Sequence, residues 1–222
     1  MSINNNGLLP PMNAASDSWR VFKILAETVE GFEAMNPLPP CVSIFGSARA
    51  RPGSDIYEET VRVARLLAEN GYGIITGGGP GLMEAANKGA VEGGGESVGL
   101  HIHLPQEQHV NPYVKTRCEF RYFFVRKLMF IKYAVAYVVM PGGMGTMDEF
   151  AEAFVLAQTG RIKPFPMVLY GRKFWGGLVD WVGNNMAAEG FIAKDELELA
   201  TVLDSPEQVL EHIRQRVPLA KD

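Results

Sequence analysis

Hydrophobic residues in this chain follow two patterns that alternate along the sequence. Short runs rich in β-branched residues are followed by longer stretches in which apolar positions recur at helical spacing. The runs that predict strands are 41–45, 72–76, 97–102, 135–140, 166–170 and 200–203. The stretches that predict helices are 55–69, 82–91, 120–133, a segment ending near Gln158, the segment with Trp175 and Trp181, and 206–216. This alternation predicts an α/β protein with a Rossmann-like, doubly wound parallel sheet flanked by helices in three layers.

An additional helix is predicted ahead of this alternation. Between Asp17 and Met35 apolar residues recur at mostly helical spacing, and Pro37 follows the run. Residues 1–16 are polar and rich in Asn and Pro, which predicts a disordered N-terminal lead. The 222 residues suit one domain, so we expect a single domain over residues 17–222.

Composition and charge restrict the partners. The formal net charge is −4 and no run rich in Lys or Arg stands out, which argues against binding of a nucleic-acid polymer. The longest apolar run, 134–140, is far shorter than the roughly 20 residues of a membrane-spanning helix. Cys41 and Cys118 form neither a CxxC pair nor a metal-binding spacing, and the N-terminus has no signal-peptide pattern. We therefore expect a cytoplasmic protein without a membrane partner.

Glycine-rich or small-residue turns follow three of the predicted strands. Ser47 follows the first, 77–81 the second and 142–146 the fourth. Because the carboxyl ends of parallel strands meet at one edge of a sheet, we expect these turns to face one crevice. Glycine lets backbone N–H groups approach an anion, and a following helix N-terminus adds unpaired donors. The turns therefore predict a phosphate-binding site.

Some residues in these turns also have a structural interpretation. Tight packing of a strand against a helix is an alternative explanation for the glycines of 77–81. In the 142–146 turn, Thr146 adds a hydroxyl that can contact a phosphate. Asp148, in the first turn of the next helix, is explained by the helix dipole alone.

Two familiar nucleotide-binding patterns are missing. No glycine in the sequence is followed by lysine, so the GxxxxGK[ST] loop of nucleoside-triphosphate enzymes is absent. About 20 residues after the glycines of 78–81, where a dinucleotide-binding protein has an acidic residue, the sequence reads Gly99-Leu100-His101. Both NTP hydrolysis and NAD binding are therefore disfavoured.

Residues 141–149 read PGGMGTMDE and form a PGGxGTxxE motif. With this motif the chain resembles the LOG ("lonely guy") family of cytokinin riboside 5′-monophosphate phosphoribohydrolases, long described as possible lysine decarboxylases. Similar residues extend over 43–49, 77–87 and 122–127, and the resemblance covers about residues 19–185.

The resemblance implies hydrolysis of the N-glycosidic bond of a nucleoside 5′-monophosphate to free base and ribose 5-phosphate, without a cofactor. The family's catalytic arginine and glutamate fall on Arg126 and Glu149. Positive, oxocarbenium-like charge builds on the ribose as this bond breaks, so Glu149 can stabilise it, hold ribose hydroxyls or activate water. Arg126 can either orient the nucleotide or assist departure of the base. A guanidinium is a poor proton donor, which favours orientation and electrostatics.

Other residues are candidates for holding the nucleotide. Met83 and Met144 would line the base pocket by resemblance, although methionine often only fills a core. Without the resemblance, Lys127 would be interpreted as part of a solvated basic helix face. The nucleotide- and phosphate-binding candidates are Ser47, Gly78, Gly79, Gly81, Met83, Lys127, Gly142, Gly143, Met144, Gly145 and Thr146.

The N-terminal helix and the Glu-Ala-Ala-Asn sequence at 84–87 make the chain similar to the longer bacterial subgroup of the family. That resemblance leaves two substrates open, a cytokinin riboside 5′-monophosphate and AMP or a related purine nucleotide. It also implies a homo-oligomer, either a dimer or a hexamer.

The same region of the sequence allows two other interpretations. His101, His103 and His109 lack the further ligands that a metal site needs, so we expect no metal and interpret them as pocket-wall or surface residues. A decarboxylase would need pyridoxal phosphate on a lysine, and no pyridinium partner is recognisable.

A nucleotide sensor without turnover is the main alternative to an enzyme. The presence of both Arg126 and Glu149 favours the enzyme. Trp175 and Trp181 are expected to pack in the core rather than serve an interaction surface.

Overall fold

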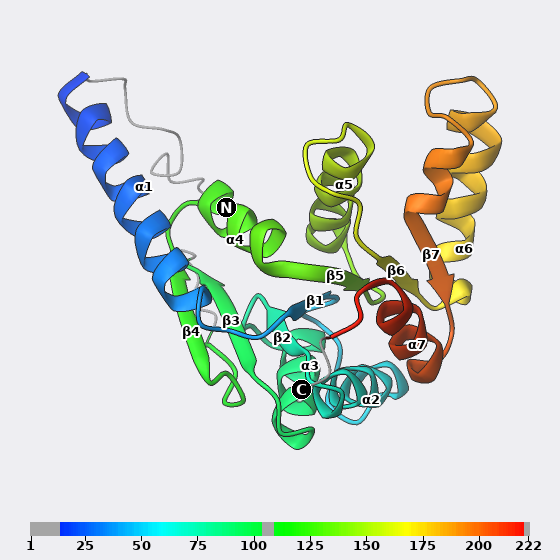
Figure 1. The fold of residues 1–222 in the computed structure, drawn as a ribbon, viewed down its shortest axis with the longest axis horizontal. Helices are drawn as coiled ribbons and strands as arrows, with labels where there is room; N and C mark the ends of the chain where they lie inside the picture. Colours follow the sequence, from blue (N-terminus) through cyan, green and yellow to red (C-terminus); the bar gives the residue numbers. More distant parts are fainter. Residues whose placement is uncertain (1–13, 104–108, 220–222) are drawn as a thin grey trace, which may run out of the picture.

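The computed structural model describes residues 14–103 and 109–219, and in this part of the chain seven parallel strands form one sheet (Figure 1). The strand order is β4-β3-β2-β1-β5-β6-β7. The strands are β1 (Cys41–Phe45), β2 (Gly73–Thr76), β3 (Ser97–Ile102), β4 (Thr116–Phe120), β5 (Ala134–Val139), β6 (Met167–Tyr170) and β7 (Ala200–Leu203). The predicted doubly wound parallel sheet is confirmed.

Helices cover both faces of the sheet, which gives the three predicted layers (Figure 1). One face carries α1 (Ala14–Met35), α4 (Phe123–Tyr133), α5 (Met144–Gln158) and α6 (Arg172–Trp181). The other face carries α2 (Asp55–Glu69), α3 (Leu82–Glu92) and α7 (Pro206–Arg216). A π-helical turn, Val182–Ala187, follows α6, and a 3-10 turn, Asp195–Leu199, precedes β7.

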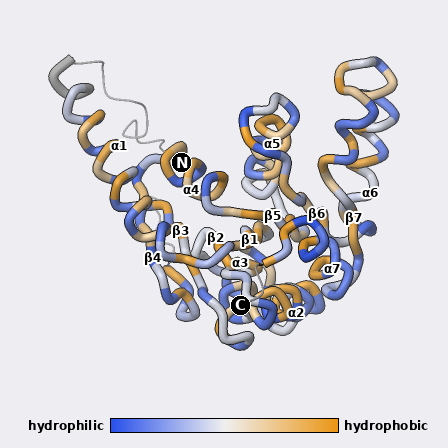
Figure 2. The backbone as a smooth tube through the Cα atoms, in the orientation of Figure 1, coloured by the Kyte–Doolittle hydropathy of each residue, from blue (hydrophilic) through white to orange (hydrophobic). Residues whose placement is uncertain are grey.

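The buried side chains form two apolar cores, one on each side of the sheet. Alternate residues of the central strands enter opposite cores, as the β1 neighbours Ile44 and Phe45 do. The middle strands are hydrophobic because both of their faces are covered (Figure 2). None of the described helices is long and apolar enough to cross a membrane.

The edge strand β4 is absent from the sequence-based prediction. It pairs in parallel with β3, and α4 begins at Phe123 rather than at residue 120. In β4 the buried Cys118 and Phe120 alternate with the exposed Arg117 and Glu119. This half-buried pattern of only five residues is typical of an edge strand, and it is easily missed beside a long polar stretch.

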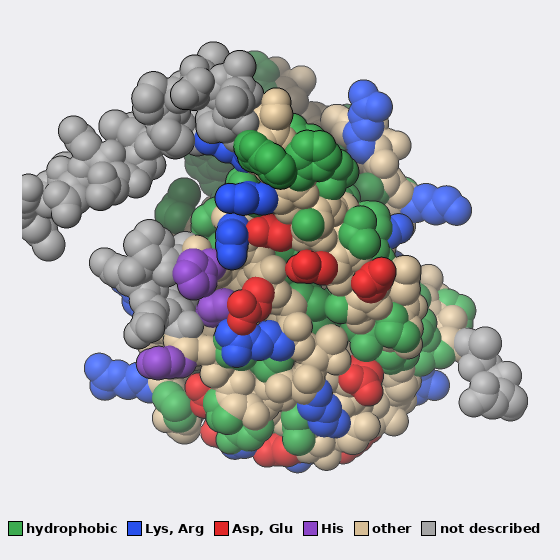
Figure 3. Space-filling model, turned by 90° about the vertical axis from the view of Figure 1, so that its left-hand side faces the viewer, with side chains coloured by type: hydrophobic (Ala, Val, Ile, Leu, Met, Phe, Trp, Pro, Cys, Tyr) green, Lys and Arg blue, Asp and Glu red, His purple; other side chains and the backbone are tan. Residues whose placement is uncertain are grey.

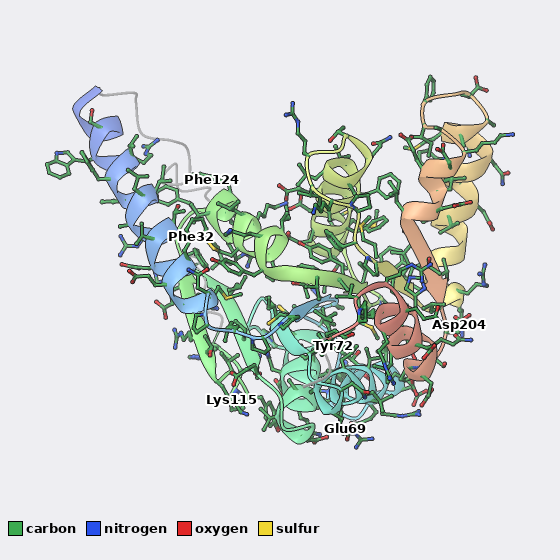
Figure 4. The ribbon with its side chains drawn as sticks, viewed as in Figure 1. Phe32, Glu69, Tyr72, Lys115, Phe124 and Asp204 are labelled. Carbon is green, nitrogen blue, oxygen red and sulfur yellow. The ribbon has the colours of Figure 1, made fainter. Side chains whose placement is uncertain are left out.

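The N-terminal helix is confirmed and packs against the element that carries Arg126. α1 begins at Ala14, inside the segment predicted to be disordered, and residues 1–13 of that prediction lie outside the described residues. Phe32 of α1, labelled in Figure 4, places its ring 6.2 Å from the ring of Tyr133 at the end of α4. The carboxylate of the buried Glu27 accepts the backbone N–H groups of Arg121 and Tyr122 at 3.1 and 3.4 Å, just before α4.

The order of the strands creates a switch point between β1 and β5. From β1 the chain adds β2, β3 and β4 on one side, then returns to add β5, β6 and β7 on the other. Loops diverge at the carboxyl ends of such a central pair and leave a crevice there. The loops remain tied, since the Ser47 N–H donates to the Pro141 carbonyl at 3.1 Å and the Met140 N–H donates to the Phe45 carbonyl at 2.8 Å.

Candidate active site

A pocket of about 920 Å³ opens at this switch point. Its wall comes from the loop after β1, the turn after β2, the end of β3, the loop before α5, and side chains of α4, α5 and α6. The volume lies in the range of small-molecule sites. The predicted convergence of the three turns is confirmed, because Ser47, Gly77 and 142–146 all line this pocket.

The N-terminus of α5 points its free donors at the pocket. Gly143 is the N-cap, and the first intrahelical bonds run from the N–H groups of Thr146 and Met147 to the Gly143 carbonyl. The N–H groups of Met144 and Gly145 therefore have no partner among the described residues. No described atom lies within 4 Å of a Cβ added at Gly143 or Gly145, so the backbone stands open to a ligand. This end of the pocket has the chemistry of an anion site.

Two other glycines of the candidate set have packing roles. A Cβ at Gly142 would lie 2.1 Å from the Thr146 hydroxyl. Gly81 has a φ of +71° and a ψ of −128°, and a Cβ there would lie 2.4 Å from the Ser47 carbonyl oxygen. The Leu82 N–H donates to that same carbonyl at 3.0 Å. Gly81 therefore lets the β2–α3 turn lock onto the β1 loop.

Gly78 and Gly79 are not among the residues that line the pocket. The Gly78 N–H donates to the Thr76 hydroxyl at 2.9 Å, and the Gly79 carbonyl accepts from the Asn111 side chain at 3.0 Å. Asn111 also donates to Asn87 of α3 at 2.9 Å in a buried polar network. These contacts favour the packing interpretation for this turn, whereas the adjacent Gly77 and Met83 do line the pocket.

Arg126 of α4 and Glu149 of α5 meet across the pocket wall. Their Nη2 and Oε1 atoms are 3.5 Å apart, and their side chains are 14% and 8% exposed. The guanidinium also lies 5.3 Å from the ring centroid of Phe123 and 5.6 Å from that of Phe130. The Arg126 Nε atom is buried with no hydrogen-bond partner among the described residues.

Burial dominates the electrostatics of this pair. It raises the pKa of Glu149 above that of an ordinary glutamate, and Lys127 and Arg126 offset the rise only in part. Burial likewise lowers the pKa of Arg126, against the opposing effect of Glu149. A negative ligand beside Arg126, or positive charge beside Glu149, would therefore be stabilised in a poorly solvated site.

Lys127 lies behind the pocket lining rather than on it. Its Nζ atom is 2.8 Å from Asp148, 2.7 Å from Glu152 and 3.9 Å from Glu149. Burial alone would lower its pKa, but the three carboxylates outweigh burial and raise it. Lys127 thus holds Glu149 in place from behind.

The pocket also has lining residues that the sequence did not single out as ligands. These include Arg49, His101, Phe123, Phe130 and Phe174. Arg49 lies in the same turn as Ser47, so its position just after a predicted strand could have marked it as a pocket residue. The phenylalanines carried no signal, because apolar residues on a helix are usually assigned to the core.

The described residues contain no group of three His, Cys, Asp or Glu side chains that could hold a metal ion. Trp175 is 2% exposed and donates its indole N–H to the Val139 carbonyl, as expected of a core residue. The same expectation for Trp181 is wrong, since it is 51% exposed at the end of α6.

The fold and the pocket define a Rossmann-like α/β protein whose pocket is lined by the N-terminus of α5 and by an arginine–glutamate pair. Residues 83–213 match the family described as possible lysine decarboxylase, and the chain belongs to this family, the LOG family. The matched region contains both Arg126 and Glu149.

Two relatives agree with this membership, and a solved structure shares the fold. A protein of Oryza sativa subsp. japonica named cytokinin riboside 5′-monophosphate phosphoribohydrolase LOG is 27% identical over 78% of this chain and 72% of its own. A cytokinin riboside 5′-monophosphate phosphoribohydrolase of Rhodococcoides fascians is 25% identical over 70% of this chain and 80% of its own. The X-ray structure of the structural-genomics target TM1055 matches 79% of this chain and 99% of its own, with a TM-score of 0.60 and 25% identity.

Proposed function

We propose that this protein hydrolyses the N-glycosidic bond of a nucleoside 5′-monophosphate, releasing the free base and ribose 5-phosphate. The observation that carries the proposal is the Arg126–Glu149 pair, 3.5 Å apart in a pocket whose adjacent helix N-terminus suits a phosphate. The names of the curated relatives support the same chemistry. Cytokinin riboside 5′-monophosphates and AMP are the proposed substrates.

The geometry of the pocket suggests an orientation for the nucleotide. We propose that the phosphate binds at Ser47 and the open backbone of 142–146. Glu149 then faces the ribose from the first turns of α5. A Cβ added at Gly77 would be 2.8 Å from Met83 and 3.8 Å from the Arg126 guanidinium, so these two side chains form one corner of the pocket. The base belongs in that corner, beyond the scissile bond.

The proposed reaction replaces the bond from C1′ to the base with a bond from C1′ to a water oxygen. The electron pair of the broken bond stays on the base, which takes up one proton while the attacking water loses one. Glu149 stabilises the positive charge on the ribose or accepts the water proton, and Arg126 orients the nucleotide or stabilises the departing base. Water supplies the second reactant, so no cofactor is required.

The first test is incubation of the purified protein with AMP and with isopentenyladenosine 5′-monophosphate, following free base by chromatography. The corresponding nucleosides are the controls. Base release from the monophosphates but not the nucleosides is expected, because the α5 terminus recognises the phosphate. Nucleotide binding without base release would instead support a nucleotide sensor.

Glu149→Gln provides the matched test of the catalytic pair. The substitution keeps the shape and removes the charge, so we expect base release to fall by roughly 10²- to 10⁴-fold while nucleotide binding persists. Glu189→Gln is the matched control, because Glu189 is exposed and does not line the pocket. Unchanged turnover in Glu149→Gln would remove the basis of the assignment.

We also propose that the protein acts as a homo-oligomer, a dimer or hexamer, and that α1 contributes an interface. Outward-facing apolar side chains run along α1 opposite its packed face. They are Trp19, Phe22, Leu25 and Val29, each more than half exposed. An antiparallel pair of α1 helices, one from each protomer, would bury this stripe.

A further inference from the structure

His101 lines the pocket, and its imidazole has no hydrogen-bond partner among the described residues. It is the next-to-last residue of β3. Its neighbour Ile102 packs into the core beneath α4, so alternation along the strand directs His101 to the opposite face, toward the β2–α3 turn. Gly77 and Met83 of that turn line the same pocket.

No described side chain forms a hydrogen bond or an ion pair with the His101 imidazole. Its register partner on the edge strand is Glu119, whose carboxylate forms an ion pair with Arg117 instead. Figure 3 views the side of the molecule that bears α1 and β4, and histidine side chains gather there beside Lys/Arg and Asp/Glu side chains. His101 is only partly buried, so a ligand in the pocket can reach it.

We propose that His101 donates a hydrogen bond to N3 or N7 of the substrate's purine base, where it selects the base and stabilises it as the leaving group. This inference rests on the proposed function. The electron pair released from C1′ accumulates on the purine ring, and a donor aimed at a ring nitrogen is more effective as that charge develops. Arg126 lines the same pocket, and one of its nitrogens is paired with Glu149. His101 would supply a second donor from another strand, in addition to the guanidinium.

The protonation state of His101 is compatible with this role. Burial lowers the pKa of His101, and Arg117 and Arg126 lower it further against the opposing effect of Glu119. The neutral ring has one N–H donor and one acceptor nitrogen. A neutral donor binds an uncharged base without placing a second cation beside Arg126.

The test combines variants of His101 with substrates that lack one ring nitrogen. The value of kcat/KM is measured for AMP, 7-deaza-AMP and 3-deaza-AMP, or for the isopentenyl series if the enzyme acts only on that nucleotide. We expect His101→Ala to lower kcat/KM for the parent nucleotide by roughly 10- to 100-fold. With the analogue that lacks the bonded nitrogen, the loss should shrink to about threefold or less, because the bond is already missing.

His101→Gln and His103→Ala complete the experiment. The amide of Gln donates an N–H, so His101→Gln should recover part of the lost activity. His103 lies two residues further along the chain and is exposed outside the pocket, so His103→Ala should stay within about twofold of the wild type. An equal loss on all three substrates, or a His101→Ala enzyme as active as the wild type, would overturn the proposal. A wild-type protein that releases no base from any of them would overturn the proposed function itself.

Discussion

Glu149 lies close to two cations, yet its pKa is raised, because burial outweighs Lys127 and Arg126. A carboxylate must be ionised to stabilise positive charge on the ribose, so kcat/KM should fall as the pH drops through this raised pKa. The acidic limb of the pH profile should therefore lie above the value of an ordinary glutamate, about 4.3. A limb at or below that value would contradict the role given to Glu149.

Lys127→Met tests how the Lys127 cation controls the acidic limb of the pH profile. Removing the cation leaves Asp148, Glu149 and Glu152 without their shared partner, so the pKa of Glu149 should rise further. We expect the acidic limb to move to higher pH and kcat/KM at pH 7 to fall roughly 10-fold. Lys132→Met, on the exposed end of the same helix, is the control. If Lys127→Met instead raises KM at every pH, the candidate role of Lys127 in direct phosphate binding is favoured.

Gly81 contributes to stability by allowing close packing of the turn between β2 and α3. Gly81→Ala forces a side chain into a glycine-only backbone conformation and against the Ser47 carbonyl. We expect the free energy of unfolding to fall by about 3 kcal/mol, against about 1 kcal/mol for Gly53→Ala. Gly53 has a similar φ of +79°, but no described atom lies within 4 Å of its added Cβ. Urea denaturation of both variants measures the difference, and equal losses would contradict a packing role for Gly81.

At the scale of elements, α1 holds the segment that leads into α4. The buried Glu27 carboxylate accepts two backbone N–H groups there, so Glu27→Ala leaves both donors unpaired. We expect a loss of about 1–3 kcal/mol in the free energy of unfolding. A lower kcat should accompany it, because Arg126 lies on α4. Glu30→Ala on the exposed face of α1 is the control for thermal melts and kinetics. A Glu27→Ala enzyme as stable and active as that control would contradict this coupling.

At the scale of the whole molecule, the outward stripe of α1 determines the expected assembly. Leu25→Glu places a charge in the middle of the stripe without disturbing the protomer's own core, because Leu25 is 54% exposed. We expect light scattering to show an oligomer for the wild type and a smaller species for Leu25→Glu. Val155→Glu on α5, also 50% exposed, should leave the assembly unchanged. A monomeric wild type, or an unchanged Leu25→Glu species, would contradict the proposed interface.

The sequence alone determined the fold class and the position of the candidate pocket. Local hydrophobic patterning indicates which segments are strands and which are helices. A parallel sheet then brings the turns that follow its strands to one edge, whatever the order of the strands. The turns around Ser47 and Gly143 could therefore be assigned to one crevice in advance. The PGGxGTxxE motif at 141–149 likewise identified the family from local residues alone.

Only the tertiary structure decided which candidates line the pocket. Gly81 and Lys127 belong to the predicted set, but one packs against Ser47 and the other is held by carboxylates of α5. The short edge strand β4 and the pocket position of His101 also depend on neighbours that are distant in sequence. Local patterns specify which element a residue belongs to. The direction of a side chain at the end of an element is set by packing between elements. No local sequence pattern specifies that packing.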